Sequence, residues 1–367
     1  MPQNYDVAIV GASLAGASAA IWLGRKGYRV ALLDGAGFPR QKPCGEGLSA
    51  FGLKQLENLG LKNLILELPH LEYKGYCLLA GRTRSYLHSP WGKSITIQRL
   101  ILDAAISSAA GRTPGVSLFL SQKVTDVRPR LLCTESKRIS ARAIILACGG
   151  NASLLKKLGC TIRRTGVSRA GVTVTFCGRF STPPQFVHIL LRKGYEIYCT
   201  PLASGRLNVS ILAPSTSGLD LKAILLSAEN LKTVFTAMDF SGELELPATG
   251  RTGIGNVRRT LAMPTVFLAG DAKEEFDPIG GMGMSHALRS GILTAQAVSE
   301  YLSEQKSLDE SSAWYGSQSQ YSLSAMRMFT GVSYRTLRVS AHVPPLLHLV
   351  ASPLATRALK FFTKELA

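Results

Sequence analysis

Two glycine-rich turns hold the residues of this 367-residue chain that are best placed for chemistry. The first, Gly11-Ala-Ser-Leu-Ala-Gly16, follows an apolar stretch and precedes an alanine-rich one. Gly11 permits a tight turn, Gly16 permits close packing of a helix on a strand, and the free N–H groups at a helix N-terminus bind pyrophosphate. Asp34 follows a second apolar stretch, at the distance from the turn where a carboxylate accepts hydrogen bonds from ribose hydroxyls. This spacing predicts a dinucleotide site.

Two residues of this motif also have simpler interpretations. Ser13 stands where such turns usually carry a second glycine. Serine is small enough for the backbone to approach a phosphate, and its hydroxyl can cap the helix. Asp34 has the alternative of an ordinary turn aspartate at the end of a strand. The first turn alone therefore leaves the dinucleotide prediction open.

The second turn lies far downstream in the chain. Gly270-Asp271 follows the apolar stretch Thr265–Ala269 and precedes a Gly-Gly-Met-Gly sequence and a helix expected from about residue 285 to residue 301. Backbone N–H groups beside a helix dipole favour negative charge, such as that on the N1–C2=O edge of a reduced flavin. Asp271 is predicted to bind ribityl hydroxyls. An ordinary glycine-rich turn is the alternative for this segment alone, but the two segments together favour FAD.

Three side chains near these turns are candidates for catalysis. Cys44 has Arg40 and Lys42 beside it, which would lower the pKa of a thiol, although a small buried hydrophobic residue is the simpler interpretation. Glu46 would donate a proton if it were buried against the flavin, and is otherwise a loop carboxylate bonded to backbone. His286 follows the second turn, where a structural histidine is the more common case. A flavin carries the redox step itself, so no catalytic base is required.

The elements that must position these residues belong to a packed α/β protein. Apolar residues make up 46% of the chain and charged residues 18%, and 35 glycines provide for many turns. Several of the strands expected between the two turns alternate polar and apolar residues, which is typical of an antiparallel sheet with one buried face. These strands are expected at residues 171–177, 186–191, 195–201 and 207–212.

We therefore predict an α/β fold in which a Rossmann-like FAD-binding domain carries an inserted antiparallel-sheet substrate domain and C-terminal helices. The predicted divisions are residues 1–70, 95–160 and 256–305 for the discontinuous FAD-binding domain, 71–94 and 161–255 for the substrate domain, and 306–367 for the helical extension.

The inserted sheet is expected to cover the flavin and to contact the substrate. Tyr195, Tyr198 and Pro278 are the predicted substrate contacts. Aromatic residues at alternate strand positions are more often part of a core than of a substrate site, and that alternative stays open.

The charge balance bears on partners. The net charge of +18 would attract nucleotides, anionic lipid surfaces or acidic carrier proteins. Because the basic residues are spread along the chain and do not cluster with aromatic ones, no nucleic-acid partner is predicted. Residues 334–366 mix Arg and Lys with Leu, Val and Phe, which is typical of basic amphipathic helices. Such helices would cover the substrate channel or contact a membrane surface.

Cysteine usage and the apolar runs bear on location. Seven cysteines without C-x-x-C or Cys/His spacing predict neither a disulfide framework nor a metal site, and they fit a reducing compartment. The polar N-terminus runs directly into a strand, so no signal peptide is expected. The longest apolar runs fall far short of the ~18 residues of a spanning helix. We expect a cytoplasmic protein, with peripheral contact at the inner membrane face as the alternative.

Four motifs in this order resemble the flavoprotein hydroxylases of the para-hydroxybenzoate hydroxylase fold and, within that fold, the geranylgeranyl reductase-like branch. They are the first turn, Phe38–Ser49, Gln98–Asp103, and Gly270–Gly283 with the helix that follows it. The resemblance implies that Cys44-Gly45 passes close to the flavin and that Arg99 reaches the FAD phosphates. The motifs and the resemblance together predict these cofactor contacts: Gly11, Ser13, Leu14, Ala15, Gly16, Asp34, Arg40, Cys44, Gly45, Arg99, Val124, Gly149, Gly270, Asp271, Gly281, Gly283 and Met284.

Several positions depart from the family pattern. Tyr198 and Thr200 stand where the reductase branch commonly has tryptophan and phenylalanine, which implies a reshaped pocket. Gly149 stands where hydroxylases of this fold carry an aspartate. In the family that segment is associated with holding FAD and with coupling to the nicotinamide reductant. Two electron sources therefore stay open: NADPH or NADH used in a different manner, or a reductase or ferredoxin partner.

The resemblance and the apolar strands favour an FAD-dependent monooxygenase. Its substrate would be a hydrophobic polyketide, isoprenoid or lipid precursor, which the enzyme would hydroxylate or epoxidise. A carrier protein or a membrane would present this substrate. The Cys-Gly-Glu loop favours the alternative of a geranylgeranyl reductase-like enzyme that reduces double bonds. A flavin-dependent halogenase is a third candidate, and a non-catalytic flavin- or lipid-binding protein is a rival of a different class.

Overall fold

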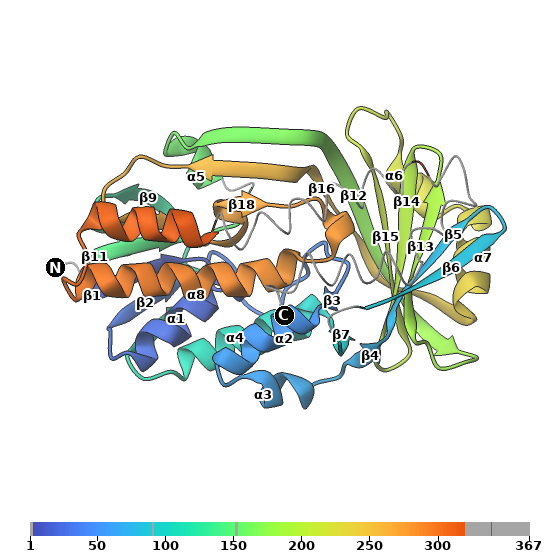
Figure 1. The fold of residues 1–367 in the computed structure, drawn as a ribbon, viewed down its shortest axis with the longest axis horizontal. Helices are drawn as coiled ribbons and strands as arrows, with labels where there is room; N and C mark the ends of the chain where they lie inside the picture. The colour runs from blue at the N-terminus through green and yellow to red at the C-terminus, as the bar shows by residue number, and fades with distance from the viewer. Residues whose placement is uncertain (1–2, 90–91, 151–152, 320–338, 340–367) are drawn as a thin grey trace.

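The computed structural model describes residues 3–89, 92–150, 153–319 and 339, and two large sheets lie at opposite ends of an elongated molecule (Figure 1). The first sheet has the order β8-β2-β1-β11-β10-β9, with β17 paired to β11. Its central strands pair in parallel, whereas β9, β10 and β11 pair antiparallel. The strands are β1 (Gln3–Val10), β2 (Val30–Leu33), β8 (Val116–Phe119), β9 (Val124–Arg128), β10 (Leu131–Thr134), β11 (Arg138–Leu146) and β17 (Val266–Leu268).

Helices cover this sheet on one face and smaller elements cover the other. Strand β2 and the second half of β1, Val7–Val10, are continuous apolar runs because neither of their faces meets water. Helices α1 (Leu14–Arg25), α4 (Arg99–Gly111) and α8 (Gly283–Leu302) share one core, and α5 (Ser153–Lys157) packs with β9 and β10 in another. Helices α1 and α8 lie close together since Gly291 has no side chain: a Cβ there would lie 2.1 Å from the carbonyl oxygen of Ala15.

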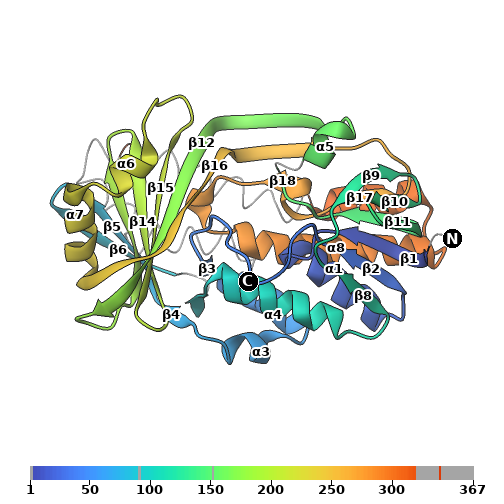
Figure 2. The ribbon, with the colours of Figure 1, turned by 180° about the vertical axis from the view of Figure 1, so that it is seen from behind.

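The second sheet has eight strands in the order β18-β16-β12-β15-β14-β13-β5-β6. All its neighbours pair antiparallel except β5 and β13, which are parallel. Helices α6 (Leu221–Leu225) and α7 (Ala228–Met238) pack on one face, which leaves the other face turned toward the first sheet (Figure 2). The strands are β5 (Gly75–Ala80), β6 (Thr83–His88), β12 (Thr161–Phe180), β13 (Phe186–Arg192), β14 (Tyr195–Leu202), β15 (Arg206–Pro214), β16 (Phe240–Thr260) and β18 (Glu274–Glu275).

Strands β12 and β16 form a long ribbon that runs from the second sheet back along the first (Figure 1). Strand β16 crosses the boundary predicted between residues 255 and 256, so one strand belongs to both predicted domains. Below the ribbon, a small sheet of β3 (Gly47–Leu48), β7 (Ser94–Thr96) and β4 (Leu71–Tyr73) joins the two halves. Helices α2 (Ala50–Asn58) and α3 (Lys62–Leu66) follow β3 in the chain.

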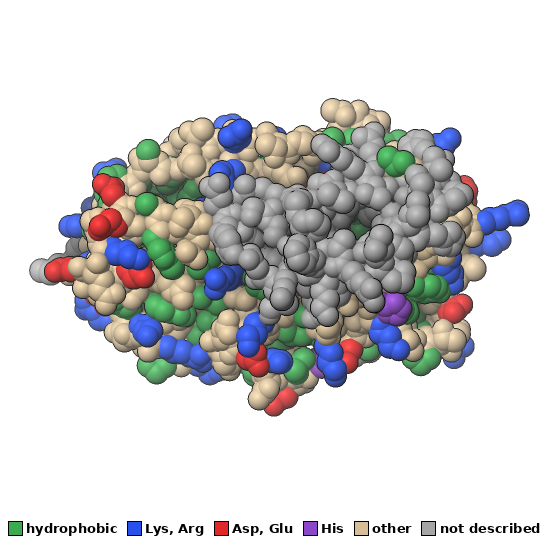
Figure 3. Space-filling model, viewed as in Figure 1, with side chains coloured by type: hydrophobic (Ala, Val, Ile, Leu, Met, Phe, Trp, Pro, Cys, Tyr) green, Lys and Arg blue, Asp and Glu red, His purple; other side chains and the backbone are tan. Residues whose placement is uncertain are grey.

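The C-terminal end of the described chain is helical. Residues 308–319 form a helix, in which the buried Tyr315 donates a hydrogen bond to the carbonyl oxygen of Leu268 at 2.7 Å. Apart from residue 339, the segment 334–366 predicted to form amphipathic helices lies outside the described residues. No helix in the described ranges has the length and apolar character needed to cross a membrane. On the face of Figure 3, Lys and Arg side chains are scattered along the lower edge and at both ends and do not gather into one patch.

A buried arginine joins the second sheet to the second glycine-rich turn. Arg169 on β12 is fully buried, and its guanidinium donates to the carboxylates of Glu196 on β14 and Asp277 in the turn before α8, the latter at 2.9 Å. Asp277 also accepts a hydrogen bond from the backbone N–H of Ile279 at 3.1 Å. Since a buried charge is costly without partners, these contacts hold the turn against the sheet.

We expect Arg169→Met to lower the free energy of unfolding by about 3–5 kcal/mol, because it leaves two buried carboxylates without their cation. Urea denaturation followed by circular dichroism measures the change. Lys93→Met is the matched control, because the Lys93–Glu72 ion pair is exposed, and its urea midpoint should equal that of the unmodified protein. An unchanged midpoint for Arg169→Met would show that this cluster does not hold the two halves together.

Candidate functional site

One cavity of about 700 Å³ lies between the two sheets, and both glycine-rich turns reach it. Asp34 and Asp271, which are far apart in the chain, both line it. The remote segments that the sequence pairs therefore do converge on a single space. Its walls come from the ends of β1, β2 and β11, from the loop between β2 and β3, and from the inner face of the second sheet.

The first turn has the geometry of a phosphate-binding turn. Gly11 has φ +104°, and a Cβ there would lie 2.4 Å from the carbonyl oxygen of Ala147. Ser13 occupies the N-cap position of α1, but its hydroxyl does not cap the helix. That hydroxyl instead donates to Asp103 at 3.1 Å and accepts from Arg99 at 3.0 Å. The first N–H groups of α1 are thus left for a ligand at this end of the cavity.

Asp34 at the end of β2 is tied to the same turn. One carboxylate oxygen accepts from the backbone N–H of Ala12 at 2.8 Å and from Arg40 at 3.2 Å, and the other accepts from the N–H of Ala36 at 3.0 Å. Only 5% of Asp34 is exposed, yet the residue lines the cavity. A carboxylate held this firmly beside a helix N-terminus fits the ribose of a dinucleotide.

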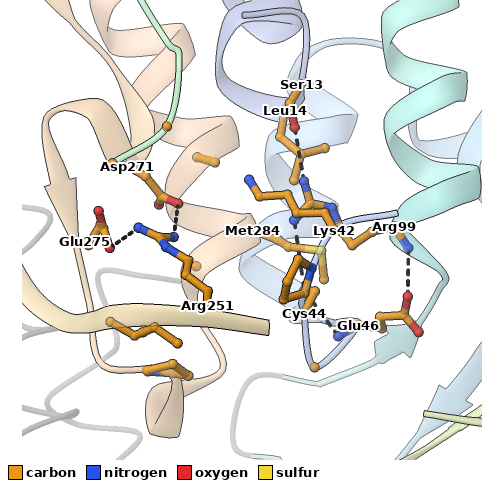
Figure 4. Close-up of a pocket in the computed structure, with 18 of the residues that line it drawn as sticks. Ser13, Leu14, Lys42, Cys44, Glu46, Arg99, Arg251, Asp271, Glu275 and Met284 are labelled. Carbon is orange, nitrogen blue, oxygen red and sulfur yellow. Dashed lines mark hydrogen bonds and ion pairs between the residues drawn. The ribbon is translucent and has the colours of Figure 1, made fainter. Parts of the chain in front are cut away.

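Arg99 is the centre of a buried polar group at the wall opposite the second turn. Its guanidinium forms an ion pair with Asp103 at 2.7 Å and lies 3.9 Å from the sulfur of Cys44. Its backbone N–H donates to Glu46 at 3.1 Å. Figure 4 shows Ser13, Arg99, Cys44 and Glu46 in a row along this wall, with the side chain of Lys42 beside them.

Two side chains of the loop between β2 and β3 have shifted pKa values because they are buried. Burial raises the pKa of the Glu46 carboxyl to about 7, although the N–H group and charge of Arg99 oppose that change. Burial and the neighbouring charge of Arg99 lower the pKa of the Lys42 amine. The second oxygen of Glu46 has no hydrogen-bond partner among the described residues. Glu46 is therefore a carboxyl group that exchanges its proton near neutral pH, and one of its oxygens is not engaged by the surrounding described residues.

This loop is also hydrogen-bonded to the second sheet. The hydroxyl of Thr200 on β14 donates to the carbonyl oxygen of Gly45 at 2.9 Å, and the amide of Asn208 on β15 donates to that of Cys44 at 3.2 Å. Cys44, Gly45 and Glu46 therefore sit where the cofactor half of the cavity meets the sheet.

The opposite wall carries a second charged group. Arg251 on β16 pairs with Glu275 at 2.7 Å and with Asp271 at 3.6 Å (Figure 4). Arg259 also pairs with Glu275 at 2.7 Å. Burial tends to raise the pKa of Asp271, but the charges of Lys42 and Arg251 outweigh it and lower that pKa, so Asp271 is ionised. Burial and the charge of Asp271 raise the pKa of Glu275.

The position where the family pattern has aspartate is open in this structure. Gly149 lines the cavity with φ +78°, and no atom lies within 4 Å of where its Cβ would be. The next residue is different, because a Cβ at Gly150 would overlap the Glu275 carboxylate. A carboxylate from β18 therefore lies against this glycine pair.

Four predicted site residues do not line the cavity. Gly16 and Gly270 serve close packing instead: a Cβ at Gly270 would lie 2.9 Å from the Ala15 side chain. Tyr195 lies on the other face of β14, packed in the core beneath α6 and α7, because successive residues of a strand face opposite sides. His286 is buried against the ring of Phe276 at 5.0 Å, and burial lowers its pKa to about 4, so it is a neutral core residue. The structure thus corrects the expectations for Tyr195 as a substrate contact and for His286 as a catalytic group.

The other predicted site residues are brought together at the cavity. They are Gly11, Ser13, Leu14, Ala15, Asp34, Arg40, Cys44, Gly45, Glu46, Arg99, Val124, Gly149, Asp271, Gly281, Gly283, Met284, Tyr198 and Pro278.

Sequence reasoning missed Tyr73, Tyr76, Arg251 and Glu275, which also line the cavity. Tyr73, Tyr76 and Arg251 lie in no glycine-rich turn or family motif, and Glu275 lies within the Gly270–Gly283 motif without having been singled out. For Arg251, the available signal was the alternation of polar and apolar residues along β16. Alternation does not tell which face of a strand lines a cavity.

Comparisons with known proteins define the class. Residues 4–310 match the family described as FAD binding domain, and the chain belongs to this family. Menaquinone reductase of Mycobacterium tuberculosis is 28% identical over 317 residues, which cover 80% of this chain and 76% of that protein. Kynurenine 3-monooxygenase of Drosophila willistoni is 24% identical over 376 residues, which cover 91% of this chain and 80% of that protein.

Solved structures support the fold. A flavoprotein/dehydrogenase from Cytophaga hutchinsonii superposes with a TM-score of 0.79 at 18% identity, covering 100% of this chain and 96% of that one. The predicted α/β class, a Rossmann-like FAD-binding unit with an antiparallel sheet and helices at the C-terminal side, is confirmed. The chain is an FAD-dependent oxidoreductase by family.

We expect Gly11→Ala to weaken FAD binding by at least about 10-fold, because a residue other than glycine at this φ costs about 1–3 kcal/mol and its Cβ would also collide with Ala147. Fluorescence titration of the apoprotein with FAD measures the dissociation constant. Gly27→Ala is the control, since Gly27 has φ +87° but open space around it and lies outside the cavity. Equal losses of FAD affinity in the two variants would contradict a role of Gly11 at the cofactor.

Proposed function

We propose that this protein is an FAD-dependent reductase that adds two hydrogen atoms to a carbon–carbon double bond of an apolar substrate, with Glu46 as the proton donor. The observation that carries the proposal is the setting of Glu46: a buried carboxyl group with a pKa of about 7 and one oxygen that has no hydrogen-bond partner among the described residues, in a loop fastened between the cofactor half of the cavity and the second sheet. A reductase of this type needs one proton for each hydride, and a buried acid with a pKa near neutral is suited to give it.

The residues present fit FAD in two halves. The turn from Gly11 to Ala15 and the carboxylate of Asp34 would hold the adenosine and pyrophosphate. Asp271 and the backbone from Gly281 to Met284, at the N-terminus of α8, would hold the ribityl chain and the ring. Reduced FAD supplies a hydride equivalent when it is bound. The protein orients the substrate, excludes water and gives the proton.

The relatives support this direction of chemistry. Menaquinone reductase matches 80% of the chain at 28% identity, and the geranylgeranyl reductase-like resemblance rests on the same Cys44-Gly45-Glu46 loop. The second half of the cavity is walled by aliphatic side chains of the second sheet, Val187, Ile189 and Leu212, which suit an isoprenoid-like substrate. NADPH, NADH or a reductase partner would return electrons to the flavin.

Monooxygenation of an apolar substrate is the second candidate. The similarity to kynurenine 3-monooxygenase over 91% of the chain favours it.

Mass spectrometry separates the two reactions: reduction adds two hydrogen atoms to the substrate and monooxygenation adds one oxygen atom. The probe is a menaquinone with four isoprene units, given to the FAD-loaded, dithionite-reduced protein. Products are analysed after oxidation in air, so that quinol formation alone leaves no mass change. Gain of oxygen, or no change, would contradict the reductase.

We expect the rate of double-bond reduction to fall as pH rises through about 7, because the raised pKa of Glu46 means that its proton is present below that value and lost above it. Glu46→Gln keeps the size of the side chain but carries no proton to give, and should slow the reaction by about 10²–10⁴-fold with no dependence on pH in this range. Single-turnover absorbance of the flavin, recorded from about 1.5 pH units below to about 1.5 pH units above 7, measures the pH profile of the unmodified protein and the rate of the Glu46→Gln protein.

Glu57→Gln is the matched control, because Glu57 is an exposed glutamate paired with Lys54 on the surface of α2. It should keep the rate and the pH profile of the unmodified protein. A Glu46→Gln protein that retains the same pH-dependent rate would exclude Glu46 as the donor.

A further inference from the structure

The cavity ends in a pair of tyrosine hydroxyls that the proposed reaction does not use. Tyr73 is the last residue of β4 and Tyr76 lies on β5, and both line the cavity. Their hydroxyl oxygens are 3.4 Å apart, and their rings meet edge to face at 5.9 Å between centroids. The two residues are three apart in the chain and lie on consecutive strands, β4 and β5, and the turn between these strands brings both hydroxyls to the cavity.

The Tyr76 hydroxyl faces the second glycine-rich turn. A Cβ at Gly281 would lie 3.2 Å from its oxygen. Gly281 belongs to the segment that leads into α8, where the flavin ring is expected. The hydroxyl is therefore at the substrate end of the cavity and near the reacting part of the cofactor.

The surroundings of the pair are apolar. Ile189 on β13 and Ile279 in the turn pack in one cluster with the rings of Tyr76 and Tyr198. A buried hydroxyl costs free energy unless it is hydrogen-bonded. Among the residues that the structure describes, Tyr73 is the one hydrogen-bond partner of the Tyr76 hydroxyl. A hydroxyl has one proton to donate and two lone pairs to accept with, so Tyr76 has capacity left for a ligand.

The direction of the hydrogen bond decides which kind of ligand group fits. Burial raises the pKa of Tyr76, so its hydroxyl keeps its proton. Either hydroxyl of the pair can donate to the other; where Tyr73 donates, the proton of Tyr76 is directed to a third partner. A neutral oxygen that accepts hydrogen bonds, such as a carbonyl oxygen, satisfies it.

Charge at this end of the cavity disfavours an anion. Arg169, the cation beside the neighbouring Tyr198, already has two carboxylate partners, Glu196 and Asp277. A carboxylate or phosphate placed beside the pair would add a further negative charge to this group without a free cation to offset it. A ketone or quinone oxygen brings no charge.

From this geometry we propose that Tyr76, oriented by Tyr73, binds a carbonyl oxygen on an otherwise apolar substrate. The substrate class is thereby narrowed from any apolar molecule to a ketone or quinone with an apolar body. The inference rests on the proposed function only in taking this cavity as the substrate site, since binding of the carbonyl group requires no reduction.

The test compares two ligands of closely similar shape. Methyl naphthyl ketone carries the carbonyl group, and isopropenylnaphthalene replaces its oxygen with a methylene group on the same planar carbon. Each is titrated into the oxidised, FAD-loaded protein, and the change in the flavin absorbance spectrum yields a dissociation constant. We expect the ketone to bind about 10-fold more tightly than the hydrocarbon, as one hydrogen bond of about 1.4 kcal/mol implies.

Tyr76→Phe should abolish that preference and leave hydrocarbon binding unchanged. Tyr73→Phe should reduce the preference less, because Tyr73 positions the donor and does not touch the ligand. Tyr86→Phe is the matched control, since Tyr86 is an exposed tyrosine on β6 outside the cavity, and it should keep the full preference.

Equal binding of the two ligands by the unmodified protein would overturn the proposal. So would a Tyr76→Phe protein that keeps the preference, or one that loses affinity for both ligands alike, which would mean that Tyr76 only shapes the wall. These titrations use oxidised protein without turnover, so they are independent of the mass change and the pH profile that test the reductase. A failure of one leaves the other standing.

Discussion

The buried ion cluster of Arg169 with Glu196 and Asp277 is the constraint on which the site depends. It fastens β12 and β14 of the second sheet to the turn that leads into α8 on the first. A buried cation between two carboxylates is stable only while all three stay in place, because removal of one partner leaves uncompensated charge in a medium of low polarity. The distance between the two sheets, and with it the width of the cavity, is therefore set by a contact that tolerates little displacement.

The loop of Cys44, Gly45 and Glu46 depends on the same arrangement. Its carbonyl oxygens accept hydrogen bonds from Thr200 and Asn208 of the second sheet, while Glu46 accepts from the backbone of Arg99 at the start of α4. The loop is thus held from both sides of the cavity. This placement explains how the pKa of a carboxyl group rises to about 7: the side chains of Thr200 and Asn208 donate to backbone carbonyls, and burial dominates the pKa of Glu46.

Local patterns predicted the cofactor half of the site and much less of the substrate half. The Gly11–Gly16 turn and Asp34 are close in the chain and belong to one strand-helix-strand unit, so their spacing specifies their geometry. On β14, the sequence did not distinguish Tyr195 from Tyr198, because the face that each residue occupies depends on where the sheet packs. His286 follows a cofactor turn in the chain, but the helix carries its ring into the core beside Phe276.

The sequence by itself determined the α/β class, the FAD-binding turn and the aspartates at the ends of two strands, because these follow from short-range spacing and the physical needs of a phosphate and a ribose. Only the tertiary structure decided that Tyr73 and Tyr76 form a pair facing the cavity, that Arg251 and Glu275 share a wall with Asp271, and that the pKa of Glu46 is raised to about 7. Those properties arise from burial and from the packing of separate elements around one cavity, and no local pattern encodes the depth at which a side chain will lie.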